Sequence, residues 1–239
     1  MRKHQRKTDG RKLPRQPRLK YLGRRGDLAV WLVDGAYVRK NIDEEFSNFG
    51  HHYTFEEIPK GELWLDTECD PDEQKFYIGH MLVEYRSREK GADAETARAR
   101  ANAHERKQRI RAGDLRKVKR GKRPADPNAV HDRLWKTLAN GVHVWFVKGR
   151  LVRSLYDIEF TEGGHEHVYE FVPRDEVWID NDIHQEEQGF VLFHELHERN
   201  LMAKGMTYDG AHEESSRLER YYRHHTSELH EALRKEGWE

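Results

Sequence analysis

The sequence predicts an α+β protein made of two tandem homologous domains, each a small antiparallel sheet followed by two helices in the order β-β-β-β-α-α. The first observation behind this prediction is an internal duplication. Sliding the chain against itself by 114 positions aligns residues 30–106 with 144–220 and gives 27 identities in 77 ungapped positions. The repeat is longer than the roughly 20–50 residues of solenoid units, so each copy should have its own core.

The second observation is that each copy starts with a strand-like pattern. Apolar and β-branched residues alternate around a glycine in 30–38 and in 142–152, which predicts a β-hairpin in each copy, with Asp34-Gly35 as the stronger turn signal. A second pair of strands is expected at 53–58 with 63–65, and at 168–172 with 177–179. The aligned tryptophans are expected in the core of the sheet: Trp31 with Trp145, and Trp64 with Trp178.

The second half of each copy changes to helical spacing. Apolar residues recur at intervals of three and four in 72–90 and 186–204, and Gly91 and Gly205 stand where a helix would be capped. A further helix is expected to begin near Asp93 and near Asp209, and in the second copy to extend as far as residue 233. A short helix is also expected at 134–138, ahead of the second domain.

Basic residues are concentrated outside the repeats. The chain has 43 basic and 43 acidic residues, yet residues 2–25 hold eleven Lys or Arg against Asp9 alone. This pattern predicts a basic flexible tail (1–26), a degenerate first repeat (27–106), a basic linker (107–140) and a second repeat (141–239). The tail and the linker are candidates for binding nucleic acid or an acidic protein surface, in the tail through residues that include Arg2, Lys3, Arg6, Lys7, Arg11 and Lys12.

Composition also limits the class of protein. The sequence shows no apolar stretch long enough for a membrane span, and the basic N-terminus is not followed by the apolar core of a secretory signal. Cys69 is the single cysteine, so a disulfide within the chain and a zinc site of several cysteines are both excluded. We therefore expect a soluble protein, intracellular or associated with a virion.

A candidate metal site occurs in the second repeat. His194 and Glu198 are four residues apart on a predicted helix, so both side chains can reach one metal ion. Glu195 follows the first candidate ligand directly and is a candidate general base. The next helix offers His212 and Glu219 on one face as further ligands, and this nitrogen-rich set favours Zn²⁺ among divalent metals.

The order of strand, helix with a His194-Glu195-Leu196 core, glycine break and helix with Ala211-His212 and Glu219 resembles the zincin metallopeptidases. It is most similar to their ImmA/IrrE-type members and to the domains found in phage polyvalent proteins. The resemblance covers about 45 residues of each copy. It implies that His194 and Glu198 are ligands, that Glu195 is the base, and that His212 or Glu219 is the third ligand. Position 198 departs from the family pattern, which ends on histidine.

The first copy keeps only part of this set. His80, Glu84 and Glu105 are retained, but the position of the base is Met81 and the position of His212 is Arg98. A hydrolytic site without a base cannot work, and an arginine repels a cation. The first copy is therefore predicted to be degenerate.

Two classes of function are consistent with these residues. One is a tandem zincin-like metal-binding protein, with a metal-dependent hydrolase or peptidase site in the second domain. The other is a non-catalytic structural or assembly protein, such as a phage particle component, whose basic tail binds nucleic acid or an acidic partner. In the second case the His/Glu pairs are hydrogen bonds that hold two helices together.

Overall fold

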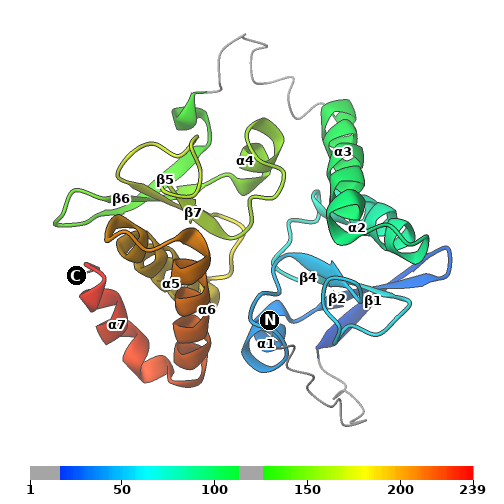
Figure 1. Ribbon diagram of the computed structural model, residues 1–239, viewed down its shortest axis with the longest axis horizontal. Helices are drawn as coiled ribbons and strands as arrows, with labels where there is room; N and C mark the ends of the chain where they lie inside the picture. Colours follow the sequence, from blue (N-terminus) through cyan, green and yellow to red (C-terminus); the bar gives the residue numbers. More distant parts are fainter. Residues whose placement is uncertain (1–16, 113–125, 239) are drawn as a thin grey trace.

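The computed structural model describes residues 17–112 and 126–238, which form two lobes, one for each repeat (Figure 1). The chain is α+β, as the sequence predicts. The first lobe contains β1 (Arg18–Arg25), β2 (Leu28–Val33), α1 (Gly35–Asn41), β3 (Phe49–His51), β4 (Glu62–Asp66), α2 (Gln74–Glu89) and α3 (Ala94–Ala112). The second contains β5 (His131–Thr137), β6 (His143–Val147), α4 (Gly149–Leu155), β7 (Gly163–His165), β8 (Glu176–Asp180), α5 (Gln185–Ala203), α6 (Tyr208–His224) and α7 (Leu229–Lys235), with 3-10 turns at Pro127–Ala129 and Thr226–Glu228.

Each repeat has a four-stranded sheet, and the two sheets have the same topology. The strand orders are β1-β2-β4-β3 and β5-β6-β8-β7. The central pairs, β2 with β4 and β6 with β8, are parallel, whereas the outer pairs are antiparallel. The prediction of an antiparallel sheet was therefore wrong at its centre. A helix is inserted between the second and third strands, so both domains share the order β-β-α-β-β-α-α, to which the second adds α7.

The expected hairpin at Asp34-Gly35 is instead the start of α1. The Asp34 carboxylate accepts a hydrogen bond from the Tyr37 backbone N–H at 2.9 Å, which is the action of a helix N-cap. Gly35 is required by packing, because a Cβ there would lie 1.6 Å from Asp66 Oδ2. Gly149 has the same relation to Asp180, at 1.8 Å. The glycine shared by both repeats thus allows a buried carboxylate to lie against the helix.

The strands expected at 53–58 and 168–172 are also absent from the described structure, which has consecutive turns there. The His51 carbonyl accepts hydrogen bonds from the backbone N–H groups of Thr54 and Phe55, both at 2.9 Å. The aromatic and branched side chains of these turns pack on the sheet instead of pairing with it. Ile58, for example, lies in one cluster with the fully buried Trp64.

Most predicted helices are confirmed, with changes at their ends. Helices α2 and α5 lie where expected, and Gly91 and Gly205 follow them with φ of 86° and 97°. The N-cap of α6 is Thr207 rather than Asp209, and α6 ends at residue 224 before the separate α7. No short helix forms at 134–138, because residues 134–137 belong to β5.

The boundaries of the predicted domains also change. Strand β1 occupies residues assigned to the tail, and β5 occupies residues assigned to the linker. Both strands pair with the next strand of their own repeat, so each folded domain begins earlier than the duplicated segment indicates.

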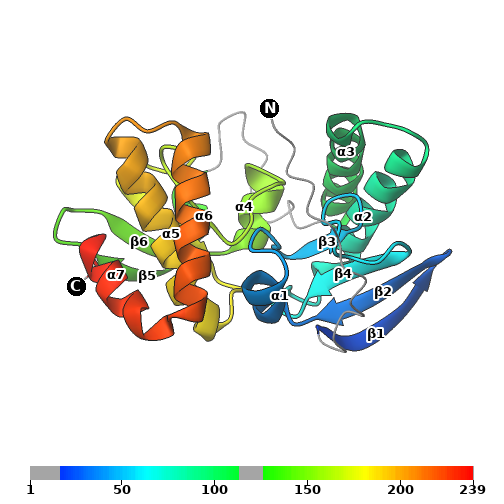
Figure 2. The ribbon, with the colours of Figure 1, turned by 60° about the horizontal axis from the view of Figure 1, so that its bottom comes forward.

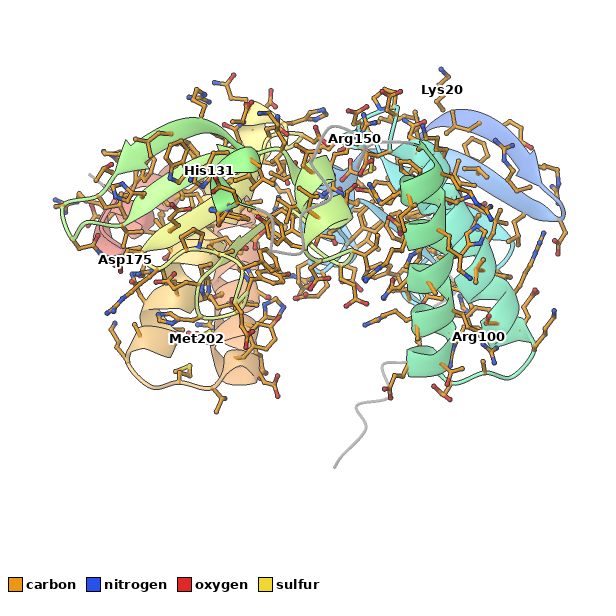
Figure 3. All side chains as sticks on the ribbon, turned by 90° about the horizontal axis from the view of Figure 1, so that it is seen from above. Lys20, Arg100, His131, Arg150, Asp175 and Met202 are labelled. Atoms are coloured by element: carbon orange, nitrogen blue, oxygen red, sulfur yellow. The ribbon has the colours of Figure 1, made fainter. Side chains whose placement is uncertain are left out.

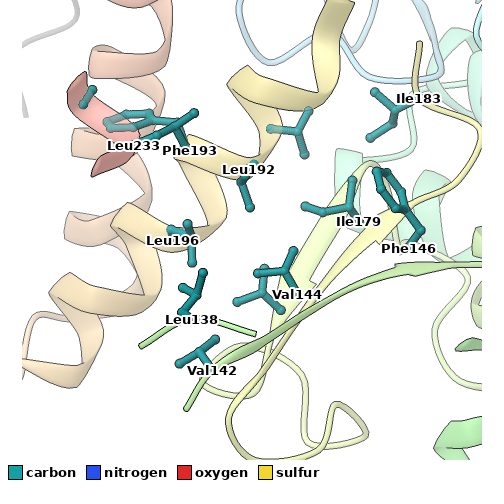
Figure 4. Close-up of a cluster of buried hydrophobic side chains, with 13 residues drawn as sticks. Leu138, Val142, Val144, Phe146, Ile179, Ile183, Leu192, Phe193, Leu196 and Leu233 are labelled. Carbon is teal, nitrogen blue, oxygen red and sulfur yellow. The ribbon is translucent and has the colours of Figure 1, made fainter. Parts of the chain in front are cut away.

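Each sheet has an apolar cluster on both faces. In the second repeat, one cluster lies between the sheet and α5, as Figure 4 shows, and includes Val144, Ile179, Leu192 and Leu196. The other cluster packs α4 and the turns around Trp178. Trp64 and Trp178 are fully buried, whereas Trp31 and Trp145 are partly buried. Among the described residues, no helix combines the length and apolar character needed to cross a membrane.

The two lobes contact each other reciprocally. Helix α1 of the first repeat lies beside α6 of the second, and α4 of the second repeat contacts α3 of the first (Figure 2). Arg39 on α1 binds Glu187 of the other repeat at 2.8 Å, and its counterpart Arg153 on α4 binds Glu73 at 3.0 Å. Arg150, also on α4, lies between the lobes (Figure 3). These helix contacts and arginine–glutamate pairs therefore occur in both directions across the interface.

Candidate metal centre

Three candidate ligand atoms converge between α5 and α6. His194 and Glu198 lie one turn apart on α5, and His212 lies on the first turns of α6. His212 Nδ1 is 3.2 Å from His194 Nε2 and 2.9 Å from Glu198 Oε2. The third side of this triangle, His194 Nε2 to Glu198 Oε2, is 3.6 Å. These residues form a group that could hold a metal ion.

The remaining polar atom of each of these three side chains also has a partner. His194 Nδ1 donates to Glu219 Oε2 at 2.9 Å, and Glu198 Oε1 accepts from His165 Nε2 at 3.0 Å. His212 Nε2 donates to Glu45 Oε2 at 3.2 Å. Since a carboxylate can only accept, these contacts place one proton on the outer nitrogen of each histidine. The nitrogens that face the cluster are then the ones able to bind a cation.

Glu195 lies beside this group, against strand β7. A Cβ on Gly163 would be 2.8 Å from Glu195 Cγ and Oε1, so the strand has space for the carboxylate only because residue 163 is glycine. Oxygen or nitrogen atoms of Glu195, His165 and Glu198 form a second group that could hold a metal ion. The Glu195 carboxylate therefore lies close enough to the cluster to contact a molecule bound there.

The pocket over this cluster has walls from both repeats. It has a volume of about 110 Å³, and Glu195, Glu219 and Ser216 contribute to its lining. Glu45 and Phe46 of the first repeat form the opposite wall. The acidic lining favours a cation in the pocket.

The histidines of the cluster are strongly basic in the metal-free protein. Burial alone would lower the pKa of His194, but hydrogen bonds to Glu198 and Glu219 raise it well above its usual value. Hydrogen bonds to Glu198 and Glu45 raise the pKa of His212 to about 9. Metal binding at these nitrogens would displace protons from them, so it would depend on pH.

The carboxylates of the site differ in pKa. Burial tends to raise the pKa of Glu198, but His165, His194 and His212 together lower it strongly. Burial also opposes ionisation of Glu219, yet His194 and Arg223 lower its pKa to about 2. Glu195 lacks comparable donors among its strongest interactions, so burial raises its pKa to about 8. Opposite shifts in neighbouring carboxylates are common in sites that carry out acid–base chemistry.

The corresponding place in the first repeat has a different composition. His80 and Glu84 are retained, His80 Nδ1 donates to Glu105 Oε2 at 2.9 Å, and His80 Nε2 is 3.5 Å from Glu84 Oε2. Met81 replaces the carboxylate of Glu195, and Phe49 replaces Gly163, with its ring centroid 5.1 Å from that of His80. The space that holds a carboxylate in one repeat is thus apolar in the other.

A larger pocket of about 270 Å³ covers this remnant. Phe49, Phe55 and Tyr77 contribute to its walls, and Arg98 lies where the second repeat has His212. Both groups that could hold a metal ion in the described part of the chain lie in the second repeat.

The structure brings together all five residues predicted for the second-repeat site. His194, Glu198 and His212 face one point, Glu219 contacts the outer nitrogen of His194, and Glu195 lies alongside. The tail residues Arg2, Lys3, Arg6, Lys7, Arg11 and Lys12 lie outside the described residues.

Two contacts of the site were not predicted. His165 comes from β7 and Glu45 from the other repeat, so helical spacing gives no information about either. Both residues are identical in the two copies, as His51/His165 and Glu45/Glu159, and this identity was the available signal.

Comparison with protein-family models, curated proteins and solved structures found no match to this chain.

Proposed function

We propose that this protein is a zinc-dependent hydrolase acting on peptide-like amide bonds, with its metal centre in the second repeat. His194, Glu198 and His212 are the proposed ligands, and Glu195 is the proposed general base. The observation that carries the proposal is the geometry of the three ligand atoms that face the cluster. The other polar atom of each ligand side chain forms a hydrogen bond with a further residue.

The distances in the cluster are consistent with a tetrahedral ion. Ligand atoms about 2.0–2.1 Å from a tetrahedral zinc lie about 3.3 Å from one another. The three separations of 3.2, 2.9 and 3.6 Å lie on both sides of that value. Two histidines and one glutamate are also a ligand set of catalytic zinc sites, which leave the fourth position open.

The outer partners further support a metal role. Ligating histidines usually donate their second N–H to a carboxylate or carbonyl, which fixes the ring and its tautomer. Glu219 and Glu45 provide such carboxylates for His194 and His212. Glu219 is in turn held by Arg223 at 2.6 Å. We therefore assign Glu219 to orienting His194, and His212 to the third ligand position.

The proposed chemistry assigns one task to each group. A zinc ion at this point would polarise the substrate carbonyl and make water more acidic. Glu195 would accept a proton from the attacking water and deliver it to the leaving amine. Its pKa of about 8 belongs to the metal-free state, and a nearby divalent cation would lower that pKa because it favours the ionised carboxylate.

Metal content of matched variants tests the proposal. We expect one zinc per full-length chain by elemental analysis, and loss of this zinc in His194→Ala. The control is His80→Ala, which removes the aligned histidine of the first repeat and should leave the zinc content unchanged. Equal zinc content in the wild type and in His194→Ala would contradict the proposal.

We also propose that the basic N-terminal residues bind a polyanion, because residues 2–25 contain eleven Lys or Arg and one Asp. Strand β1 begins at Arg18, so a truncation that preserves the fold should remove only residues 1–16. We expect this truncation to weaken salt-dependent binding to duplex DNA. Unchanged binding would exclude the tail as its cause.

A further inference from the structure

We propose that the first repeat is part of the metal centre of the second, and that Glu45 is the positioning residue that it supplies. This inference rests on the proposed function. It extends that function, because the proposed ligands and base all belong to the second repeat.

The direct contact is the one between Glu45 and His212. The Glu45 carboxylate accepts from His212 Nε2 at 3.2 Å, while His212 Nδ1 faces His194 and Glu198. This hydrogen bond fixes the tautomer in which Nδ1 is free to bind the ion, and it fixes the plane of the imidazole ring. The His212 side chain is about a third exposed, and Glu45 contacts its Nε2.

Glu45 is held in place by its own repeat. The next residue, Phe46, is fully buried against Trp64, with ring centroids 6.5 Å apart. The Glu45 backbone N–H donates to Asp43 Oδ1 at 3.0 Å. The carboxylate therefore projects from a fixed loop, although the side chain itself is about half exposed.

A second connection to the first repeat reaches His194 through buried ion pairs. Arg39 contacts Glu187 at 2.8 Å, Glu187 contacts Arg223, and Arg223 holds Glu219 at 2.6 Å. Glu219 then accepts from His194 Nδ1. Two of the three proposed ligands are thus oriented, directly or through this chain, by side chains of the other repeat.

The aligned contact in the opposite direction provides a matched control. Glu159 of the second repeat reaches α3 of the first, where it accepts from Asn102 Nδ2 at 2.6 Å. Glu45 and Glu159 are aligned residues, but the helix facing Glu159 has Arg98 in place of the ligand histidine. Loss of either carboxylate should remove a hydrogen bond between the repeats, whereas only loss of Glu45 should remove a hydrogen bond to a proposed metal ligand.

The test measures zinc affinity by competition with a chromophoric chelator, and visible absorption of the Co²⁺-loaded protein. We expect Glu45→Gln to weaken zinc binding about tenfold, the lower end for an outer carboxylate, because Glu45 is half exposed. The Co²⁺ spectrum should change with it, and Glu45→Asp should recover part of the affinity. Glu159→Gln should bind zinc within about twofold of the wild type, with an unchanged Co²⁺ spectrum.

The outcomes separate this inference from the proposed function. If His194→Ala loses zinc but Glu45→Gln binds it like the wild type, the inference is overturned and the metal centre stands. Equal weakening by Glu45→Gln and Glu159→Gln would also overturn it, since the effect would then come from the interface in general. Zinc binding that does not depend on His194 would overturn both proposals.

Discussion

The two pockets of this molecule share a framework and differ in the groups that could do chemistry. Both keep a histidine and a glutamate one helical turn apart, and both connect that histidine to a carboxylate and an arginine of the next helix: His80 with Glu105 and Arg109, and His194 with Glu219 and Arg223. Three of the aligned positions at which they differ adjoin the His/Glu pair, where Gly163, Glu195 and His212 replace Phe49, Met81 and Arg98. The same hydrogen-bond network therefore joins the two helices in both repeats, and the side chains around the His/Glu pair distinguish the candidate metal centre from its counterpart.

The largest expected effect tests the role assigned to Glu195. Glu195→Gln should retain zinc but lower hydrolysis of peptide substrates at least 100-fold, because general acid–base catalysis contributes about 10²–10⁴-fold. Two measurements are needed: turnover of a fluorogenic peptide library, and the zinc content of the same protein samples. Undiminished turnover in a zinc-loaded Glu195→Gln protein would show that Glu195 is not the general base, so the Glu195/Met81 difference between the repeats would have no catalytic meaning.

The next prediction tests the symmetry of the interface. Arg39 and Arg153 are 1% and 3% exposed, and each is surrounded by carboxylates of both repeats. Replacing either with alanine should lower the free energy of unfolding by about 3–5 kcal/mol, because buried carboxylates lose their counter-charge. Urea denaturation of both variants measures the effect. A large loss in only one of them would show that the interface is not energetically reciprocal.

A smaller effect, dependent on pH, is expected in the first repeat. Burial alone would lower the pKa of His80, but Glu105 and Glu84 raise it to about 9, above the usual 6.5. The stabilisation from protonated His80 is then complete below pH 6.5 and is lost as pH rises through 9. The free energy of unfolding of His80→Gln should fall below that of the wild type by about 2–3 kcal/mol more at pH 6 than at pH 10. A difference that is constant with pH would indicate that His80 is neutral in the folded protein.

The smallest expected effect is weak zinc binding gained by the first repeat. Arg98→His should place a third candidate ligand beside His80 and Glu84 and allow a second, weaker zinc to bind. Hydrolysis should not increase, because Met81 provides no base. Zinc titration of the variant measures the stoichiometry, and a value that stays at one would show that the outer contacts of the second repeat are also required.

The sequence was sufficient to predict features that depend on local spacing or on the repeat itself. The duplication, the positions of α2 and α5, and the approach of His194 to Glu198 follow from identities and helical periodicity. Gly91 and Gly205 adopt the left-handed conformation expected after a helix.

Features that depend on tertiary packing were missed. Asp34-Gly35 has the composition of a hairpin turn, but Asp34 caps a helix, and Gly35 leaves space for Asp66 from a later strand. The parallel pairing of β2 with β4 has no local signature. Glu45 meets His212 only after the two repeats dock, so spacing within one repeat could not indicate that contact.

The reciprocal interface has a consequence for how such a molecule can change. In a homodimer of identical chains, every substitution appears at both sites, so one site cannot lose its function while the other keeps it. Joining the two copies in one polypeptide removes that restriction. Arg98 and Met81 can then occupy one half while Glu45 of the same half continues to serve the other. One half can act as a permanent subunit for its neighbour, at a fixed one-to-one ratio and independent of protein concentration.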